Sequence, residues 1–99
     1  MAVKVIVEFQ AKPGRRPELL RLMHDMGEKF GPIMRERGAR GFTLYEALDN
    51  PDMVVEIAEW ETAEAREALV QEAMASGAFA PMMELLAAPP VARYVKPLT

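Results

Sequence analysis

The hydrophobic residues of the chain change their spacing after its first segment. Residues 3–11 are rich in Val, Ile and Phe, which favours a strand. From Pro17 onward, hydrophobic residues recur every three or four positions, which predicts a helix. Pro32 lacks a backbone N–H, so we expect a kink or a break near the end of that helix. The residues of this helical stripe are Leu19, Met23, Met26, Phe30 and Ile33.

The rest of the chain alternates predicted strands and helices. Residues 49–52 form a turn by composition, and Pro89 and Pro90 end the last helical stretch. Thr62 can cap a helix, because its hydroxyl can accept from the free amides of the first turn. The remaining predicted elements are strands at 42–48, 53–61 and 91–95, a helix from Thr62 to about residue 74, and a short helix at 79–87. The order β-α-β-β-α-β predicts an α+β, ferredoxin-like domain over residues 1–99, with a four-stranded antiparallel sheet.

The central hairpin can be placed in register from its turn. A connection of residues 49–52 puts Leu48 opposite Met53 and Leu44 opposite Ile57. Because side chains alternate between the faces of a sheet, one face becomes nearly all apolar and should pack under the helices. Glu46 and Glu59 are its exceptions. The apolar residues of this predicted helix-facing side are Phe42, Leu44, Leu48, Met53, Val55 and Ile57, together with Val3, Val5, Val7 and Phe9 of the first strand.

The opposite face mixes aromatic, small and charged residues. Tyr45 and Trp60 on an uncovered face would form an exposed apolar patch, which usually marks an interaction site. We therefore expect a homodimer with a small-molecule pocket in each subunit, either between sheet and helices or where two sheets meet. The predicted residues of this face are Lys4, Ile6, Glu8, Gln10, Thr43, Tyr45, Ala47, Val54, Glu56, Ala58 and Trp60.

Composition supports this interpretation and excludes several functions. Half of the 99 residues (51%) are hydrophobic, more than so short a monomer easily buries. The net charge of −3 and the lack of a basic patch argue against nucleic-acid binding. The absence of cysteine excludes thiol chemistry, and one histidine with scattered acids does not make a metal site. Without a signal peptide or membrane-spanning pattern, we interpret the chain as a soluble cytoplasmic protein.

Several segments together resemble the antibiotic biosynthesis monooxygenase family of the dimeric α+β barrel superfamily. They are the strand from Val3 to Val7 followed by Lys12-Pro13-Gly14, the stretch from Gly41-Phe42 to Tyr45-Glu46, the run from Val55 to Glu61 that leads directly into a helix, and Phe79. The family includes cofactor-free monooxygenases of phenols and quinols, as well as haem-degrading enzymes. The resemblance implies a homodimer that oxidises a small aromatic substrate with O₂ and needs no cofactor.

The resemblance also implies roles for individual residues. Trp60 would stack on the ring or stabilise oxygen through its indole N–H, and Tyr45 would hydrogen-bond the phenolate. Glu56 or Glu8 would accept a proton if burial raises the pKa of its carboxyl. We predict Trp60, Tyr45 and Glu56 as catalytic residues. The predicted substrate-binding residues are Glu8, Gln10, Thr43, Phe79, Met82 and Met83.

Departures from the family pattern leave other interpretations open. The haem-degrading branch has a histidine where Met82 or Met83 falls and an asparagine where Glu8 or Gln10 falls, so haem degradation is disfavoured. The same pocket could instead hold a small apolar ligand without reaction, or belong to an isomerase or lyase of a small oxygenated ring. Glu56 could be structural, paired with Lys4 or with an arginine of the other subunit. His24 could be a boundary residue of the first helix.

Overall fold

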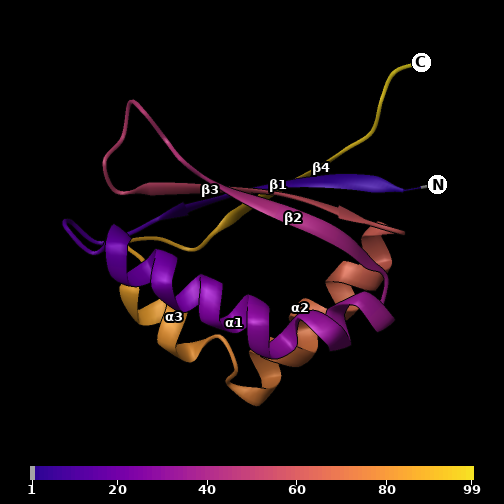
Figure 1. Ribbon diagram of the computed structural model, residues 1–99, viewed down its shortest axis with the longest axis horizontal. Helices are drawn as coiled ribbons and strands as arrows, with labels where there is room; N and C mark the ends of the chain where they lie inside the picture. The colour runs from indigo at the N-terminus through magenta and orange to yellow at the C-terminus, as the bar shows by residue number, and fades with distance from the viewer. Residues whose placement is uncertain (1) are drawn as a thin grey trace.

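A four-stranded antiparallel sheet is covered by helices on one face only, in a computed structural model that describes residues 2–99 (Figure 1). The strand order is β2-β3-β1-β4, so the hairpin of β2 and β3 lies beside the first strand and β4 closes the other edge. The elements are β1 (Val3–Gln10), α1 (Arg16–Glu36), β2 (Ala39–Glu46), β3 (Met53–Trp60), α2 (Ala63–Ser76), α3 (Ala80–Leu85) and β4 (Val91–Val95). The predicted element order and fold class are confirmed.

The first helix is longer and more continuous than its sequence suggests. α1 runs through Pro32 to Glu36, so of the predicted kink or break the break is wrong, and the kink stays a prediction. Pro32 removes one backbone hydrogen bond, but it lies on the exposed side of the helix, where water can bind the carbonyl it leaves free. Leu19 and Met23 of the predicted stripe are buried, whereas Ile33 is 55% exposed. Ile33 therefore lies off the core-facing side of α1, while Met34 of the same turn packs against the core.

The predicted register of the β2–β3 hairpin is wrong by one residue. Leu44 pairs with Glu56 and Phe42 pairs with Ala58, and the backbone N–H of Ala47 donates to the carbonyl of Met53 at 3.2 Å. The connection therefore comprises residues 48–52 rather than 49–52. A slip of one residue exchanges the two faces of a strand, because side chains alternate.

The slip exchanges the two faces of β3 and leaves the predicted faces of β1 and β2 unchanged. Contrary to prediction, Val54, Ala58 and Trp60 are buried on the helix-facing side. Val5, Val7 and Phe9 of β1 are buried on that side as predicted. The residues of β3 that were expected under the helices lie instead on the uncovered face. They are Met53, Val55, Ile57 and Glu59.

A long-range contact explains the longer connection. The Arg16 guanidinium at the start of α1 donates to the carbonyls of Ala47, Asn50 and Met53 at 3.3, 3.0 and 3.4 Å. The Asn50 carboxamide also accepts from the backbone N–H of Asp52 at 3.0 Å. These bonds satisfy the backbone of the wide loop, while Leu48 projects fully into solvent.

The core lies between the sheet and the helices. Thr62 caps α2 as predicted, its hydroxyl accepting from the backbone N–H of Ala65 at 3.1 Å. None of the helices in residues 2–99 is long and apolar enough to cross a membrane. The buried core residues are Val5, Val7, Phe9, Ala11, Leu19, Met23, Val54, Ala58, Trp60, Met82, Leu85 and Leu86.

Candidate functional site

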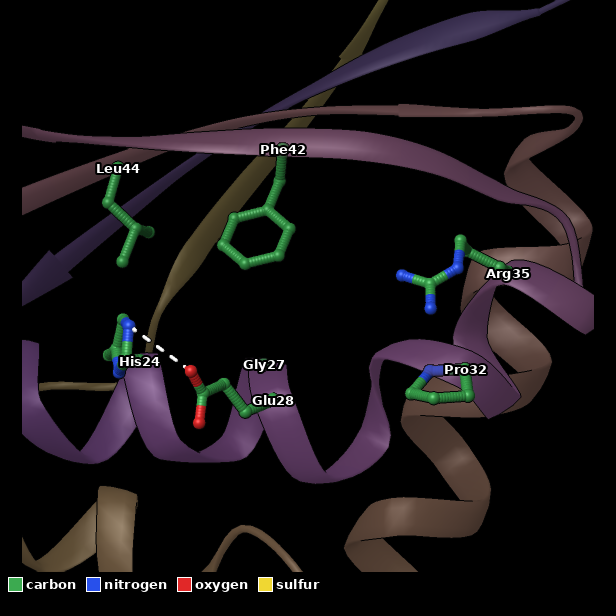
Figure 2. A pocket seen from close by; sticks show the side chains of 7 residues that line it. All are labelled: His24, Gly27, Glu28, Pro32, Arg35, Phe42 and Leu44. Carbon is green, nitrogen blue, oxygen red and sulfur yellow. Dashed lines mark ion pairs between the residues drawn. The ribbon is translucent and has the colours of Figure 1, made fainter.

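A cleft opens between the exposed part of α1 and the edge strand β2, with a volume of about 580 Å³ (Figure 2). One wall is a single side of the helix, and the other is formed by two side chains of the strand. The spacing on the helix follows from its period of 3.6 residues, which brings positions 24, 28, 32 and 35 to one side. The lining residues are His24, Gly27, Glu28, Pro32, Arg35, Phe42 and Leu44.

Gly27 lets the aromatic wall approach the helix closely. A Cβ atom built on Gly27 would lie 3.0 Å from Cζ of Phe42, which is tighter than ordinary van der Waals contact. Phe42 nevertheless keeps 44% of its surface exposed. Its ring projects from β2 into the cleft, where it forms an apolar surface that a ligand can contact (Figure 2).

The polar side chains of the cleft separate into two ends. Nε2 of His24 lies 3.7 Å from Oε1 of Glu28, a contact that becomes an ion pair when the imidazole is protonated. Arg35 lies toward the other end, beyond Phe42, with its guanidinium directed into the cleft (Figure 2). Within residues 2–99 Arg35 makes no ion pair. The cleft therefore carries an acid–imidazole end and a cationic end.

Glu56 lies on the helix-facing side of the sheet, beside the cleft wall. Its register neighbours are Leu44, which lines the cleft, and Val7, which is buried. Burial raises the pKa of the Glu56 carboxyl, and the positive charge of Arg66 on α2 opposes that shift. No side chain or backbone group of residues 2–99 donates a hydrogen bond to this carboxyl. Glu56 is thus a partly buried acid with a charged neighbour and free acceptor atoms.

Of the two partners considered for Glu56, Lys4 is wrong, and an arginine of a second subunit stays a prediction. Lys4 pairs in register with Glu59 and points to the uncovered face, because its neighbour Val5 is buried under the helices. The cation near Glu56 is Arg66, whose guanidinium also donates to the Tyr94 hydroxyl at 2.9 Å. Glu56 meets Arg66 rather than Lys4 because the register of β3 turns Glu56 toward the helices.

Trp60 also lies on the helix-facing side, contrary to the predicted uncovered face. It is 5% exposed and stands opposite Val3 of β1 and Ala39 of β2. Trp60 and Glu56 therefore share one face of β3, as predicted, but that face is the interior one. A substrate that reaches either residue must enter between sheet and helices.

Tyr45 is separated from Trp60 and Glu56 by the thickness of the sheet. It is 49% exposed on the uncovered face, where Thr43 is also exposed, beside a shallow hollow of about 240 Å³. Glu8 is exposed on this face as well, and the Gln10 carboxamide accepts from that of Asn50 at 2.8 Å. Tyr45 cannot act with Trp60 or Glu56 on one substrate within a single chain.

The remaining predicted substrate-binding residues belong to the packing of α3. Met82 is buried at 6% exposure, and Met83 and Phe79 pack against the same core cluster. All three belong to the core packing, and none of them lines the cleft. Their role in substrate binding stays a prediction.

Sequence reasoning missed the polar side of α1. His24, Glu28 and Arg35 are spaced by four and seven residues, a spacing that places them on one side of a helix. That signal was available beside the apolar stripe, and Phe42 and Leu44 were correctly assigned to the facing side of the sheet. Within the part of the chain that the structure describes, no group of three His, Cys, Asp or Glu side chains could hold a metal ion.

Comparison with known proteins identifies the family. The family model described as antibiotic biosynthesis monooxygenase matches residues 2–80. No curated protein matches the chain. Among solved structures, a candidate antibiotic biosynthesis monooxygenase from Bordetella bronchiseptica is 21% identical with a TM-score of 0.84, covering 99% of this chain and 98% of that one.

Two further solved structures show the same fold. A protein from Mycobacterium tuberculosis is 26% identical with a TM-score of 0.75, covering 100% of this chain and 97% of its own. A conserved protein from Methanosarcina mazei is 20% identical with a TM-score of 0.76, covering 97% and 92%. With the family model matching most of its length, the chain belongs to the antibiotic biosynthesis monooxygenase family.

Proposed function

We propose that this protein is a cofactor-independent monooxygenase that oxidises a small phenol or quinol with O₂. The observation that carries the proposal is Glu56, a partly buried carboxyl with a raised pKa and no hydrogen-bond donor among residues 2–99. It stands beside Leu44 on the face of the sheet that borders the cleft. Family membership supports the same class of reaction.

The reaction needs no external reductant. A phenol that loses its proton becomes an electron-rich anion, which can pass one electron to O₂ and then combine with the reduced oxygen at a ring carbon. One oxygen atom becomes the new carbonyl oxygen, the other leaves as water, and the phenol is oxidised to a quinone by the four electrons that O₂ accepts. The protein must remove the proton, hold the ring and keep water away from the radical pair.

The residues on the helix-facing side suit these tasks. Glu56 would accept the phenolic proton, because a carboxyl with a raised pKa is a stronger base than one in water. The positive charge of Arg66 would limit the rise in that pKa. Trp60 would supply a flat apolar surface and an indole N–H donor in the interior.

Oxygen uptake with a panel of quinols, hydroxynaphthoquinones and polyphenols tests the proposal. We expect uptake above the autoxidation blank with at least one compound, and a loss of roughly tenfold or more in Trp60→Phe, which removes the indole N–H. Tyr45→Phe is the matched control on the uncovered face and should keep the rate. Uptake that depends on Tyr45 and not on Trp60 would place the reaction at the uncovered face instead.

The other outcomes separate the alternative functions. Compounds that quench Trp60 fluorescence without consuming O₂ would identify a binding protein rather than an enzyme. A product formed under argon would identify an isomerase or lyase. Either result would contradict the monooxygenase proposal.

We also propose that two copies pair through the uncovered face of the sheet. Members of this family are typically dimers that bind small ligands. The face carries Tyr45 at 49% exposure, Val91 at 53% and Val95 at 38%, next to the partly buried Ile6 and Val55. A surface of this composition is apolar enough to bury against a second copy.

Sedimentation velocity at micromolar concentration tests the pairing. We expect a dimer for the parent chain and a shift toward monomer in Val55→Asp, because that change places a charge in the paired surface without a partner. Leu48→Asp, in the fully exposed loop, is the control and should leave the dimer intact. A parent chain that sediments as a monomer would refute the proposal.

A further inference from the structure

We propose that the cleft between α1 and β2 binds an anionic aromatic molecule, with a carboxylate at Arg35 and the ring against Phe42. Binding of such a ligand stands on the geometry of the cleft alone. Its identification as the substrate class rests on the proposed monooxygenase function. The proposal adds a specificity-determining cation to the cleft, which is lined by Leu44, the register neighbour of Glu56.

Arg35 is available to bind a ligand, because no acidic side chain of residues 2–99 pairs with it. Its neighbours Arg37 and Arg40 pair with Glu72 and Glu59, whereas Arg35 makes no ion pair within residues 2–99. Its side chain turns back along the helix, so that a Cβ built on Gly31 would lie 3.4 Å from Nη1 of Arg35. Figure 2 shows the guanidinium directed into the cleft. A guanidinium presented in this way matches a carboxylate, which it can bind with two parallel N–H donors.

The charges of the cleft give the ligand one orientation. Glu28 lies beside His24 at the end opposite Arg35, so a carboxylate is repelled at the first end and attracted at the second (Figure 2). A phenolic hydroxyl at the first end could instead donate to Glu28 or bond to the imidazole of His24. The ligand that fits has its hydroxyl and carboxylate apart on a flat ring system.

The walls between the two ends suit a flat ring. Phe42 exposes 44% of its surface between the polar ends, and the tip of its ring lies against Gly27, so a ligand ring would pack on the exposed flank of Phe42. The volume of about 580 Å³ is in the usual range for small-molecule sites, roughly 300–1,000 Å³. A fused two-ring aromatic acid fits this description.

Binding of 6-hydroxy-2-naphthoate and of 2-naphthol, measured by calorimetry at fixed ionic strength, tests the proposal. The two probes share a ring system and a hydroxyl and differ by the carboxylate. We expect the parent chain to bind the carboxylate roughly tenfold more tightly, and Arg35→Gln to lose that preference while binding of 2-naphthol is unchanged. Arg21→Gln is the matched control, because Arg21 is exposed on the same helix and does not line the cleft.

Amide chemical shifts locate the site independently. We expect the naphthoate to perturb the amides of Gly27, Gly31 and Phe42 in the parent chain. Equal losses in Arg35→Gln and Arg21→Gln would show a general charge effect and overturn the proposal, as would shifts confined to the uncovered face of the sheet. Selective binding without any oxygen uptake would refute the proposed function and leave this inference standing. Oxygen uptake without tighter binding of the naphthoate would refute this inference and leave the proposed function standing.

Discussion

Glu56→Gln is expected to lower the rate of substrate-dependent oxygen uptake by roughly 10²–10⁴-fold, the usual cost of removing a general base. The amide is close in size to the carboxyl but cannot accept the phenolic proton at neutral pH. Initial rates from an oxygen electrode at saturating substrate measure the effect. Glu59→Gln is the matched control, since it removes the same charge from the same strand on the opposite face.

The same variant should be more stable than the parent chain at neutral pH. Burial raises the pKa of Glu56 in the folded state above its unfolded value, so ionisation costs more in the folded chain. The parent chain therefore loses stability as the pH rises from the unfolded pKa through the folded one, and keeps that loss above it. Glu56→Gln carries no such loss, and thermal unfolding from pH 4 to pH 8 should show a smaller decline.

The pair of measurements separates catalysis from packing. A variant with a lower rate and equal or higher stability supports Glu56 as the base. A variant that keeps the parent rate would contradict the assignment, whatever its stability. A lower rate together with lower stability would show that Arg66 depends on the Glu56 charge, and that Glu56 is structural.

Val54→Asp is expected to cost about 4 kcal/mol or more of folding free energy, enough to unfold many domains of this size. Val54 is 0% exposed between Phe9 of β1 and Glu46 of β2, on the side that packs under the helices. An aspartate there would bury a charge in an apolar core. Thermal unfolding followed by circular dichroism measures the loss.

Val55→Asp is the adjacent control and tests the register directly. Val55 lies on the uncovered face, so this variant should fold and lose only its pairing with a second copy. In the register predicted from the sequence, Val55 would face the core and Val54 would not. A folded Val54→Asp beside an unfolded Val55→Asp would therefore contradict the observed hairpin.

Local patterns were sufficient for the order of elements and for two of the three strand faces that were predicted, those of β1 and β2. The alternation in β1 correctly buried Val5 and Val7, and Phe42 and Leu44 of β2 correctly face the helices. Thr62 marked the start of α2 because capping depends on residues close in the sequence. Each of these predictions rests on neighbours within a few positions.

The candidate site was less predictable, because an error of one residue in the predicted register changed which residues share a face of the sheet. Trp60 and Glu56 were expected beside Tyr45, yet the sheet separates them. The cleft was missed because its helix wall, with Arg35 at one end, meets β2 only in the folded chain. The pattern of α1 alone shows a polar side, but not what stands opposite.

The sequence by itself determined the β-α-β-β-α-β order, the family and the presence of an acid on the strand that carries Trp60. The tertiary structure alone decided which face of β3 is interior. That choice depends on the length of the hairpin connection, which Arg16 sets by hydrogen bonds to the carbonyls of Ala47, Asn50 and Met53 from a distant helix. Because side chains alternate along a strand, this long-range contact fixes where Glu56 and Trp60 point.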